Sequence, residues 1–161
     1  MDMNLAVDTV KYYNYYNTPI GVVTISSDGK SVTSLKMGKQ GGFQGERKRD
    51  AVLDEAYTQL CQYLKGERET FDLPLNPDGS DYQKKVWQLL MDVPYSKTVT
   101  YKDLALAMGK KKSFRAVGGA VSRNPILIFI PCHRVVGLDG SLTGYSGGID
   151  VKEKLLNIES K

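Results

Sequence analysis

A cysteine and a histidine stand side by side at Cys132 and His133, directly after Pro131. His133 is the only histidine in the chain, and Arg134 adds a cation at the next position. A cysteine attacks as the thiolate, and a neighbouring imidazole, cation or helix N-terminus lowers the thiol pKa enough to form it. The pattern predicts a nucleophilic thiol at Cys132, although a buried, inert cysteine fits that residue alone equally well.

The segment before the cysteine predicts how the thiol is held. Five apolar residues, Ile126–Ile130, lie between Pro125 and Pro131. Because proline lacks a backbone N–H and fixes its own φ, we expect a buried strand that ends at Pro131 with Cys132 at its mouth. Consecutive residues of a strand point to opposite faces, so a bend at the proline or a bridging water is needed to connect Cys132 with His133.

Several other cysteine chemistries are excluded by the residues present. A papain-like hydrolase needs a histidine distant in sequence, and a cysteine phosphatase needs an arginine six residues after the cysteine, where this chain has Leu138. With only Cys61 and Cys132, the chain has no disulfide framework, and one histidine argues against a Cys/His zinc site. We expect no metal, and we expect Cys61 to lie in the core on the apolar stripe of a helix.

The second half of the chain is predicted to be mostly helical. Two short helices with a glycine between them are typical of a helix-turn-helix. The Phe114–Ser122 segment contains Gly118 and Gly119, which cost about 1 kcal/mol each relative to alanine in a helix. Either close helix packing or close approach to nucleic acid explains them, and composition does not separate the two. The expected helices are Tyr82–Met91 (capped by Ser80 or Asp81, with Val86, Trp87, Leu89, Leu90 and Met91 in the core), Tyr101–Met108, Phe114–Ser122 (capped by Ser113) and Val151–Ile158.

The first half is predicted to contain strands followed by a helix. Asp28-Gly29 indicates a hairpin turn, and Gly66 indicates a helix end. Residues 47–49 are interpreted as a solvated entrance to the helix, and the tyrosines at 12, 13, 15 and 16 as strand residues. The expected strands are Val10–Tyr16, Gly21–Ser26 and Ser31–Met37, and the expected helix is Ala51–Leu64. We place a first domain at 1–71, a linker at 72–80 and a second domain at 81–161.

Charge is divided unevenly over the 161 residues, whose formal net charge is +4. Residues 1–80 hold 9 Lys/Arg and 11 Asp/Glu, a net of −2, and residues 81–161 hold 13 and 7, a net of +6. This asymmetry predicts a polyanionic partner for the second half. No apolar run approaches the roughly 18 residues of a membrane span, and no signal-peptide core is present, so we expect no membrane partner and a cytoplasmic location.

Several motifs occur together and in order across Tyr82–Glu159, about half of the chain. They are Arg115-Ala-Val-Gly-Gly-Ala, Asn124-Pro125, Pro131-Cys132-His133-Arg134-Val135 and Tyr145-Ser-Gly-Gly. This combination resembles the O6-alkylguanine-DNA alkyltransferases (methylated-DNA–protein-cysteine methyltransferases). The resemblance implies an α+β protein, with an N-terminal ribonuclease-H-like α/β domain and a C-terminal winged-helix, helix-turn-helix DNA-binding domain.

The resemblance also implies roles for the residues that match. Cys132 is the nucleophile, His133 and Glu159 activate it through a water, and Tyr101 donates a proton to the leaving guanine. Arg115 takes the place of the flipped-out base, although Ser113 and Phe114 depart from the small residues that the family has before the arginine. Asn124 braces the turn before the cysteine. The other implied base- and DNA-binding residues are Val121, Val135, Tyr145, Ser146, Ala116, Gly118 and Gly119, with Lys110–Lys112 read as phosphate contacts or solvated lysines.

The implied function is DNA repair by direct transfer of an alkyl group from guanine O6 to Cys132, with thymine O4 as a lesser substrate. The product thioether has no good leaving group, so each molecule acts once and needs no cofactor. The expected partner is double-stranded DNA carrying O6-alkylguanine, bound by a monomer. A helix-turn-helix regulator, a lesion binder of the related cysteine-lacking type, and a thiol redox sensor remain alternatives.

Overall fold

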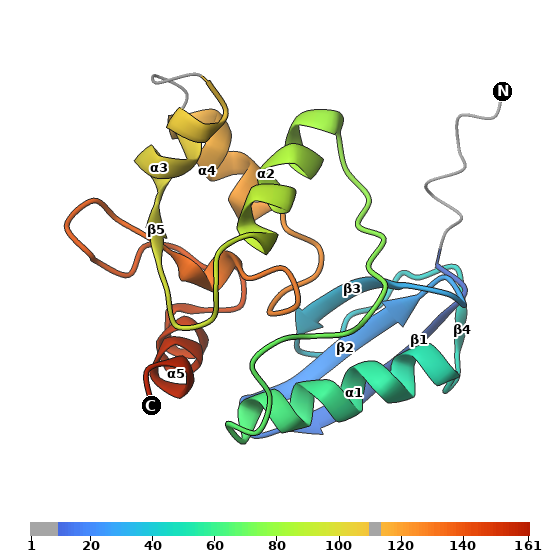
Figure 1. Ribbon diagram of the computed structural model, residues 1–161. Coiled ribbons are helices and arrows are strands. Elements are labelled where there is room, and N and C mark those ends of the chain that lie inside the picture. The colour runs from blue at the N-terminus through green and yellow to red at the C-terminus, as the bar shows by residue number, and fades with distance from the viewer. Residues whose placement is uncertain (1–9, 110–113) are drawn as a thin grey trace, which may run out of the picture. The chain divides into compact units, whose positions relative to one another are not determined.

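The computed structural model describes residues 10–109 and 114–161, which form two compact units divided between Asp78 and Gly79 (Figure 1). The predicted cap at Ser113 and the predicted phosphate contacts at Lys110–Lys112 lie outside the described residues. Within the described residues, no helix is long and apolar enough to cross a membrane.

The first unit is a four-stranded sheet with one helix against it (Figure 1). Its strand order is β3-β2-β1-β4, with antiparallel pairing except between β1 and β4, which run parallel. Helix α1 packs against β1, β2 and β3, and residues Val23–Ser27 of β2 and Val32–Leu35 of β3 are buried without alternation, so both faces of these strands are covered. The elements are β1 (Tyr12–Thr18), β2 (Gly21–Ser27), β3 (Val32–Met37), β4 (Glu46–Arg47) and α1 (Ala51–Leu64).

Helix α1 has the bounds that its sequence predicts. Asp50 caps its first turn by accepting a hydrogen bond from the Leu53 amide at 2.7 Å. After the helix, Gly66 has a φ of 77°, a left-handed conformation that favours glycine. The prediction that Cys61 lies in the core is wrong, because this cysteine is only half-buried at the margin of the apolar stripe.

Arg47 is exposed, as expected, but it lies in strand β4 and not at the entrance of the helix. Arg47 pairs with Tyr13 in the sheet, and its guanidinium lies 4.7 Å from the centre of the Tyr15 ring. A two-residue strand is determined by the neighbour it pairs with, so its own sequence carries little signal. Within the expected linker, the Val32 amide donates to the Pro74 carbonyl at 2.9 Å, so this stretch runs along β3.

The described residues of the second unit form four α-helices and a small parallel pair of strands (Figure 1). Ser80 and Gln83 form a capping box at the start of α2. The indole N–H of Trp87 donates to the Ala120 carbonyl at 2.8 Å, which ties α2 to α4. The prediction that Met91 lies in the core is wrong: this last residue of α2 is 43% exposed, whereas Leu90 before it is buried. The elements are α2 (Asp81–Met91), β5 (Val99–Thr100), α3 (Tyr101–Ala107), α4 (Phe114–Ser122), β6 (Val135–Val136) and α5 (Ile149–Glu159).

The apolar segment Ile126–Ile130 is buried but is not the predicted strand. The Ile130 amide donates to the Ile126 carbonyl at 3.0 Å, and Ile128 has a φ of 73°. The Asn124 side chain accepts from the Ile126 amide and donates to the Ile130 carbonyl, both at 2.9 Å. Side-chain hydrogen bonds to the backbone compete with a sheet ladder, and here they close the segment into a turn.

Candidate active site

Cys132 lies on a single 3₁₀ turn, η1 (Cys132–Arg134), which follows Pro131. Its side chain is almost fully buried, with 4% exposure, and its amide donates to the Ile130 carbonyl at 2.8 Å. Because the turn is not extended, Cys132 and His133 are not forced onto opposite faces as they would be in a strand. Of the two expected connections, a bend at the proline or a bridging water, the bend is present.

A buried carboxylate, Glu159, joins His133 to Arg134. Nε2 of His133 lies 2.7 Å from Oε2 of Glu159. The Arg134 guanidinium donates two hydrogen bonds to the same carboxylate, at 2.9 Å and 3.0 Å. It donates a third to the Val93 carbonyl at 2.7 Å. Although Glu159 is the last residue of α5, it is only 2% exposed, so these contacts hold the helix end in place.

Burial decides the protonation of both reactive side chains. It lowers the pKa of His133 against the opposing effect of Glu159, so the imidazole is neutral at pH 7. Burial also raises the pKa of the Cys132 thiol to about 11, although a hydrogen bond from Asn124 and the positive charge of Lys152 oppose the rise. The resting site therefore holds a neutral thiol beside a neutral imidazole.

A small hollow reaches Cys132, and its empty volume of about 230 Å³ includes space open to solvent. Five of the residues predicted for the site meet at this hollow, where a planar base would contact aromatic and small side chains. The other predicted base-reading residue, Val135, is buried on β6 directly after the 3₁₀ turn. The hollow is lined by Tyr101, Val121, Ser122, Cys132, Gly144, Tyr145 and Ser146.

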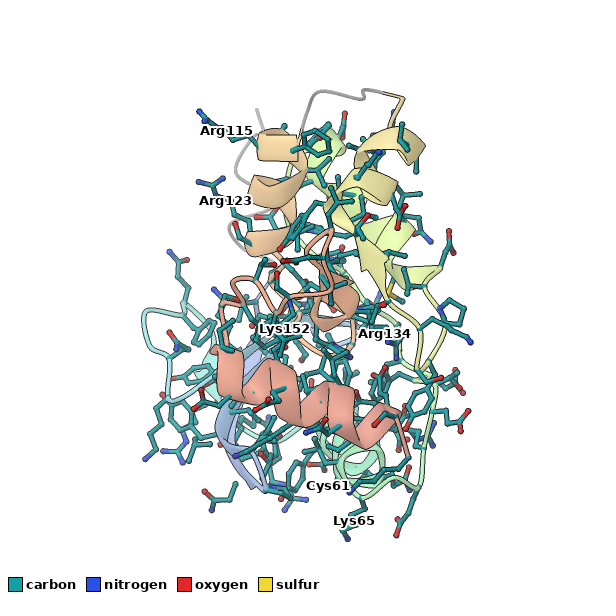
Figure 2. The ribbon with its side chains drawn as sticks, turned by 90° about the vertical axis from the view of Figure 1, so that its left-hand side faces the viewer. Cys61, Lys65, Arg115, Arg123, Arg134 and Lys152 are labelled. Atoms are coloured by element: carbon teal, nitrogen blue, oxygen red, sulfur yellow. The ribbon has the colours of Figure 1, made fainter. Side chains whose placement is uncertain are left out.

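Packing among residues 10–109 and 114–161 does not explain the small-residue face of α4. A Cβ built at Gly118 would lie 4.0 Å from the Tyr101 ring, and one at Gly119 would lie 3.8 Å from the end of the Arg123 side chain. Both are ordinary van der Waals distances, so alanine would fit at either glycine. Arg115 and Ala116 are exposed, and Figure 2 shows Arg115 and Arg123 projecting on the same side of α4. The helix thus presents glycine and alanine between two arginines.

Four residues near the site were not predicted to have a role from the sequence, or were noted there only because they lie next to a predicted site residue. They are Arg123, Lys152, Thr143 and Arg134. Arg123 lies eight residues after Arg115 and so shares its helix face. Lys152 is fully buried, and its Nζ donates to the Thr143 carbonyl at 3.1 Å. Its position seven residues before Glu159, on the same face of α5, is the signal that could have found it. Thr143 contacts Tyr101, and Arg134 contacts Glu159. No local sequence pattern predicts either contact.

Fold and site together define a helix-turn-helix protein that carries one buried cysteine beside a histidine–carboxylate pair. Residues 81–161 match the family described as 6-O-methylguanine DNA methyltransferase, DNA binding domain, and residues 11–77 match its ribonuclease-like domain. The chain therefore belongs to the 6-O-methylguanine DNA methyltransferase family. The resemblance drawn from the sequence, and the α+β fold class with its two kinds of domain, are confirmed.

Curated relatives cover nearly the whole chain. A methylated-DNA–protein-cysteine methyltransferase of Methanosarcina barkeri is 43% identical over 157 residues, 92% of this chain and 96% of the relative. The constitutive enzyme of that name from Bacillus subtilis is 41% identical over 158 residues, 93% of this chain and 96% of the relative. The crystal structure of Mycobacterium tuberculosis OGT in complex with DNA is similar with a TM-score of 0.86 and 39% identity, covering 92% of each chain.

Proposed function

We propose that this chain repairs alkylated double-stranded DNA by moving an alkyl group from guanine O6 to Cys132, once per molecule. The observation that carries the proposal is a single buried thiol in a hollow also lined by Tyr101 and Tyr145, next to the His133–Glu159 pair. Family membership supports the same reaction, because the relatives are named methylated-DNA–protein-cysteine methyltransferases and one structure holds DNA.

The first step moves the thiol proton. Nε2 of His133 donates to Glu159, so the neutral ring presents Nδ1 as the base, and a bridging water relays the proton from the Cys132 sulfur to it. Glu159 stabilises the imidazolium that forms, while Arg134 keeps the carboxylate ionised and oriented. Asn124 and Lys152 favour the thiolate through a hydrogen bond and a positive charge.

The second step is an in-line displacement at the alkyl carbon. The thiolate forms a carbon–sulfur bond while the bond between that carbon and guanine O6 breaks, and the electron pair of the broken bond stays on the base. Tyr101 donates a proton to guanine N3 as negative charge gathers on the leaving group. The products are guanine and an S-alkyl cysteine thioether, and neither needs a cofactor to form.

Reaching guanine O6 inside a duplex requires the base to leave the stack, at a cost of a few kcal/mol. We propose that α4 enters the minor groove, since Ala116, Gly118 and Gly119 leave room for the backbone to approach closely. Arg115 fills the gap left by the extruded base, where its planar guanidinium stacks and hydrogen-bonds. The carbonyls of Cys132 and Val135 and the amide of Ser146 read the base edges, and Tyr145 covers the base.

The experiment that tests this function is an intact-mass measurement after incubation with O6-benzylguanine. One benzyl group should appear, and peptide mapping should place it on Cys132. The Cys132→Ser variant should remain unlabelled while still binding duplex DNA, and Cys61→Ser should label as the wild type does. An unmodified Cys132 in folded protein, or label on Cys61 instead, would overturn the proposal. Duplexes with O4-methylthymine test the lesser substrate, and light scattering on the DNA complex tests the proposed monomer.

A further inference from the structure

Two partly buried hydrogen bonds link Lys152, in the first turn of α5, to the hydroxyl of Tyr101. Lys152 of α5 donates from Nζ to the carbonyl of Thr143 at 3.1 Å, and the Thr143 hydroxyl donates to the Tyr101 hydroxyl at 3.0 Å. Thr143 lies on the loop that continues into Gly144, Tyr145 and Ser146 of the hollow. Figure 2 labels Lys152 on α5, well away from the exposed Arg115 and Arg123.

We propose that Thr143 and Lys152 are positioning residues for alkyl transfer, which together direct the proton of Tyr101 toward the base in the hollow. The proposal rests on the function proposed above, since it concerns the proton donor of that reaction. It assigns Thr143 to orient the phenol and Lys152 to hold Thr143 and to balance the charge that develops at the sulfur.

The direction in which the Tyr101 proton points follows from the hydrogen bonds that a phenol hydroxyl can donate and accept. A tyrosine hydroxyl has one proton to donate and lone pairs that accept. Because Thr143 donates to the Tyr101 oxygen, the phenol proton does not point at Thr143 and is turned toward another acceptor. Tyr101 lines the hollow that reaches Cys132, where a bound guanine would supply N3 as that acceptor. The same hydrogen bond stabilises the phenol oxygen as its proton leaves.

The burial of Lys152 fits a site in which negative charge appears during the reaction. Its side chain is fully buried, and among residues 10–109 and 114–161 no carboxylate forms an ion pair with it. An ammonium buried without a counter-charge is costly, typically several kcal/mol. Burial lowers the pKa of Lys152, and the negative charge of a Cys132 thiolate would oppose that shift and supply a counter-charge. In the resting site Lys152 thus has the Thr143 carbonyl as a hydrogen-bond partner, and an opposite charge reaches it only when the thiolate forms.

The test for Thr143 is a pair of matched variants. Thr143→Val keeps the shape of the side chain but removes the donor, and Thr143→Ser keeps the donor. In single-turnover transfer from a duplex containing O6-methylguanine, Thr143→Val should lower the limiting rate about tenfold with little change in the half-saturating DNA concentration. Thr143→Ser should retain most of the wild-type rate. Equal rates for Thr143→Val and the wild type would overturn the proposal.

A second substrate separates positioning from a general structural effect. A duplex with 3-deaza-O6-methylguanine lacks the nitrogen that Tyr101 protonates, so the wild type should slow, and Thr143→Val should slow no further on it. A merely structural defect would slow both substrates by the same factor, and that result would contradict the inference. If Thr143→Val does not fold, as judged by circular dichroism, comparison of Thr143→Ala with Thr143→Ser decides the same question.

The contribution of Lys152 is tested through thiol chemistry that needs no proton from Tyr101. Iodoacetamide should alkylate Cys132 at the wild-type rate in Thr143→Val, but several-fold more slowly in Lys152→Gln, which keeps a donor but has no charge. Unchanged alkylation in Lys152→Gln would refute the part assigned to its charge. A wild-type protein that transfers no alkyl group at all would instead sink the proposed function, so the two failures are distinguishable.

Discussion

The buried carboxylate of Glu159 forms hydrogen bonds with both His133 and Arg134. Removing one member of a buried, hydrogen-bonded ion pair leaves the other charge without compensation, which costs about 3–5 kcal/mol. Glu159→Gln should therefore lower the free energy of unfolding of the second unit by about that amount, measured by urea denaturation.

The control for this change lies on the same helix. Glu153 is exposed on α5, and Glu153→Gln should alter stability by less than about 0.5 kcal/mol. Adding Arg134→Met to Glu159→Gln should restore part of the loss, because the uncompensated guanidinium is then removed. A Glu159→Gln variant as stable as Glu153→Gln would show that the carboxylate is not the centre of this cluster.

The Cys132 thiol makes stability depend on pH in the alkaline range. Its pKa in the folded protein is raised by burial from 9.0 to about 11, so the folded state holds the proton more tightly than the unfolded chain does. This contribution is fully present below pH 9 and is lost as the pH rises toward 11. Between pH 8 and pH 10 the wild type should lose about 1 kcal/mol more stability than Cys132→Ser, measured by urea denaturation at both values. Equal losses would show that the thiol is not protonated as described.

At the residue scale, sequence reasoning reached the members of the site that occur in recognisable motifs. Cys132 and His133 were prominent because they are adjacent and because histidine occurs once. Lys152 was not found, since a lysine in an amphipathic helix is normally solvent-facing and only the fold shows it buried. Thr143 was invisible for a similar reason, because its contact with Tyr101 spans 42 residues. The catalytic and DNA-binding roles of all these residues remain predictions.

At the scale of elements, the two glycines of α4 offer a test of what that helix faces. Alanine fits at Gly119 without crowding, and alanine in a helix is favoured over glycine by about 0.5–1 kcal/mol. Gly119→Ala should therefore raise the stability of the protein by about that amount and yet weaken binding to duplex DNA, measured by fluorescence anisotropy.

For Gly109, which lies outside α4, we expect the opposite effect of alanine on stability. Gly109 has a φ of 76°, so Gly109→Ala should destabilise the protein even though no atom of the described residues lies within 4 Å of the added Cβ. If Gly119→Ala leaves DNA affinity unchanged, the small-residue face of α4 does not approach the groove.

Two helices were predicted with correct bounds, three others differed from their predicted bounds by one or two residues at an end, and the elements defined by partners were not predicted. Helices α1 and α4 match their predicted ranges because apolar spacing and local residue types determine them. The apolar segment Ile126–Ile130 was predicted as a strand because five branched and aromatic residues in a row suit one. Its turn depends on Asn124, whose side chain replaces the hydrogen bonds that a neighbouring strand would give.

At the scale of the whole molecule, charge is concentrated in the half that contains α4. Binding to duplex DNA should weaken steeply with salt, because each phosphate that a cation neutralises releases counterions. If Arg123 contacts a phosphate, Arg123→Ala should reduce the slope of log affinity against log salt by about 0.9. The exposed Lys30 of the first unit is the matched control, and Lys30→Ala should leave the slope unchanged. A slope equally insensitive to both changes would remove Arg123 from the interface.

The sulfur of Cys132 is the only thiol in residues 79–161, and it is buried at the hollow rather than exposed at the surface. Once the sulfur carries an alkyl group, a rescuing nucleophile would have to reach the carbon on the side opposite the sulfur, and no second cysteine of this unit could do so. Each repaired base then consumes one molecule of such a protein, so repair stops when all copies are alkylated. A cell's capacity for it equals the number of unused copies, and it is replenished only by synthesis of new chains.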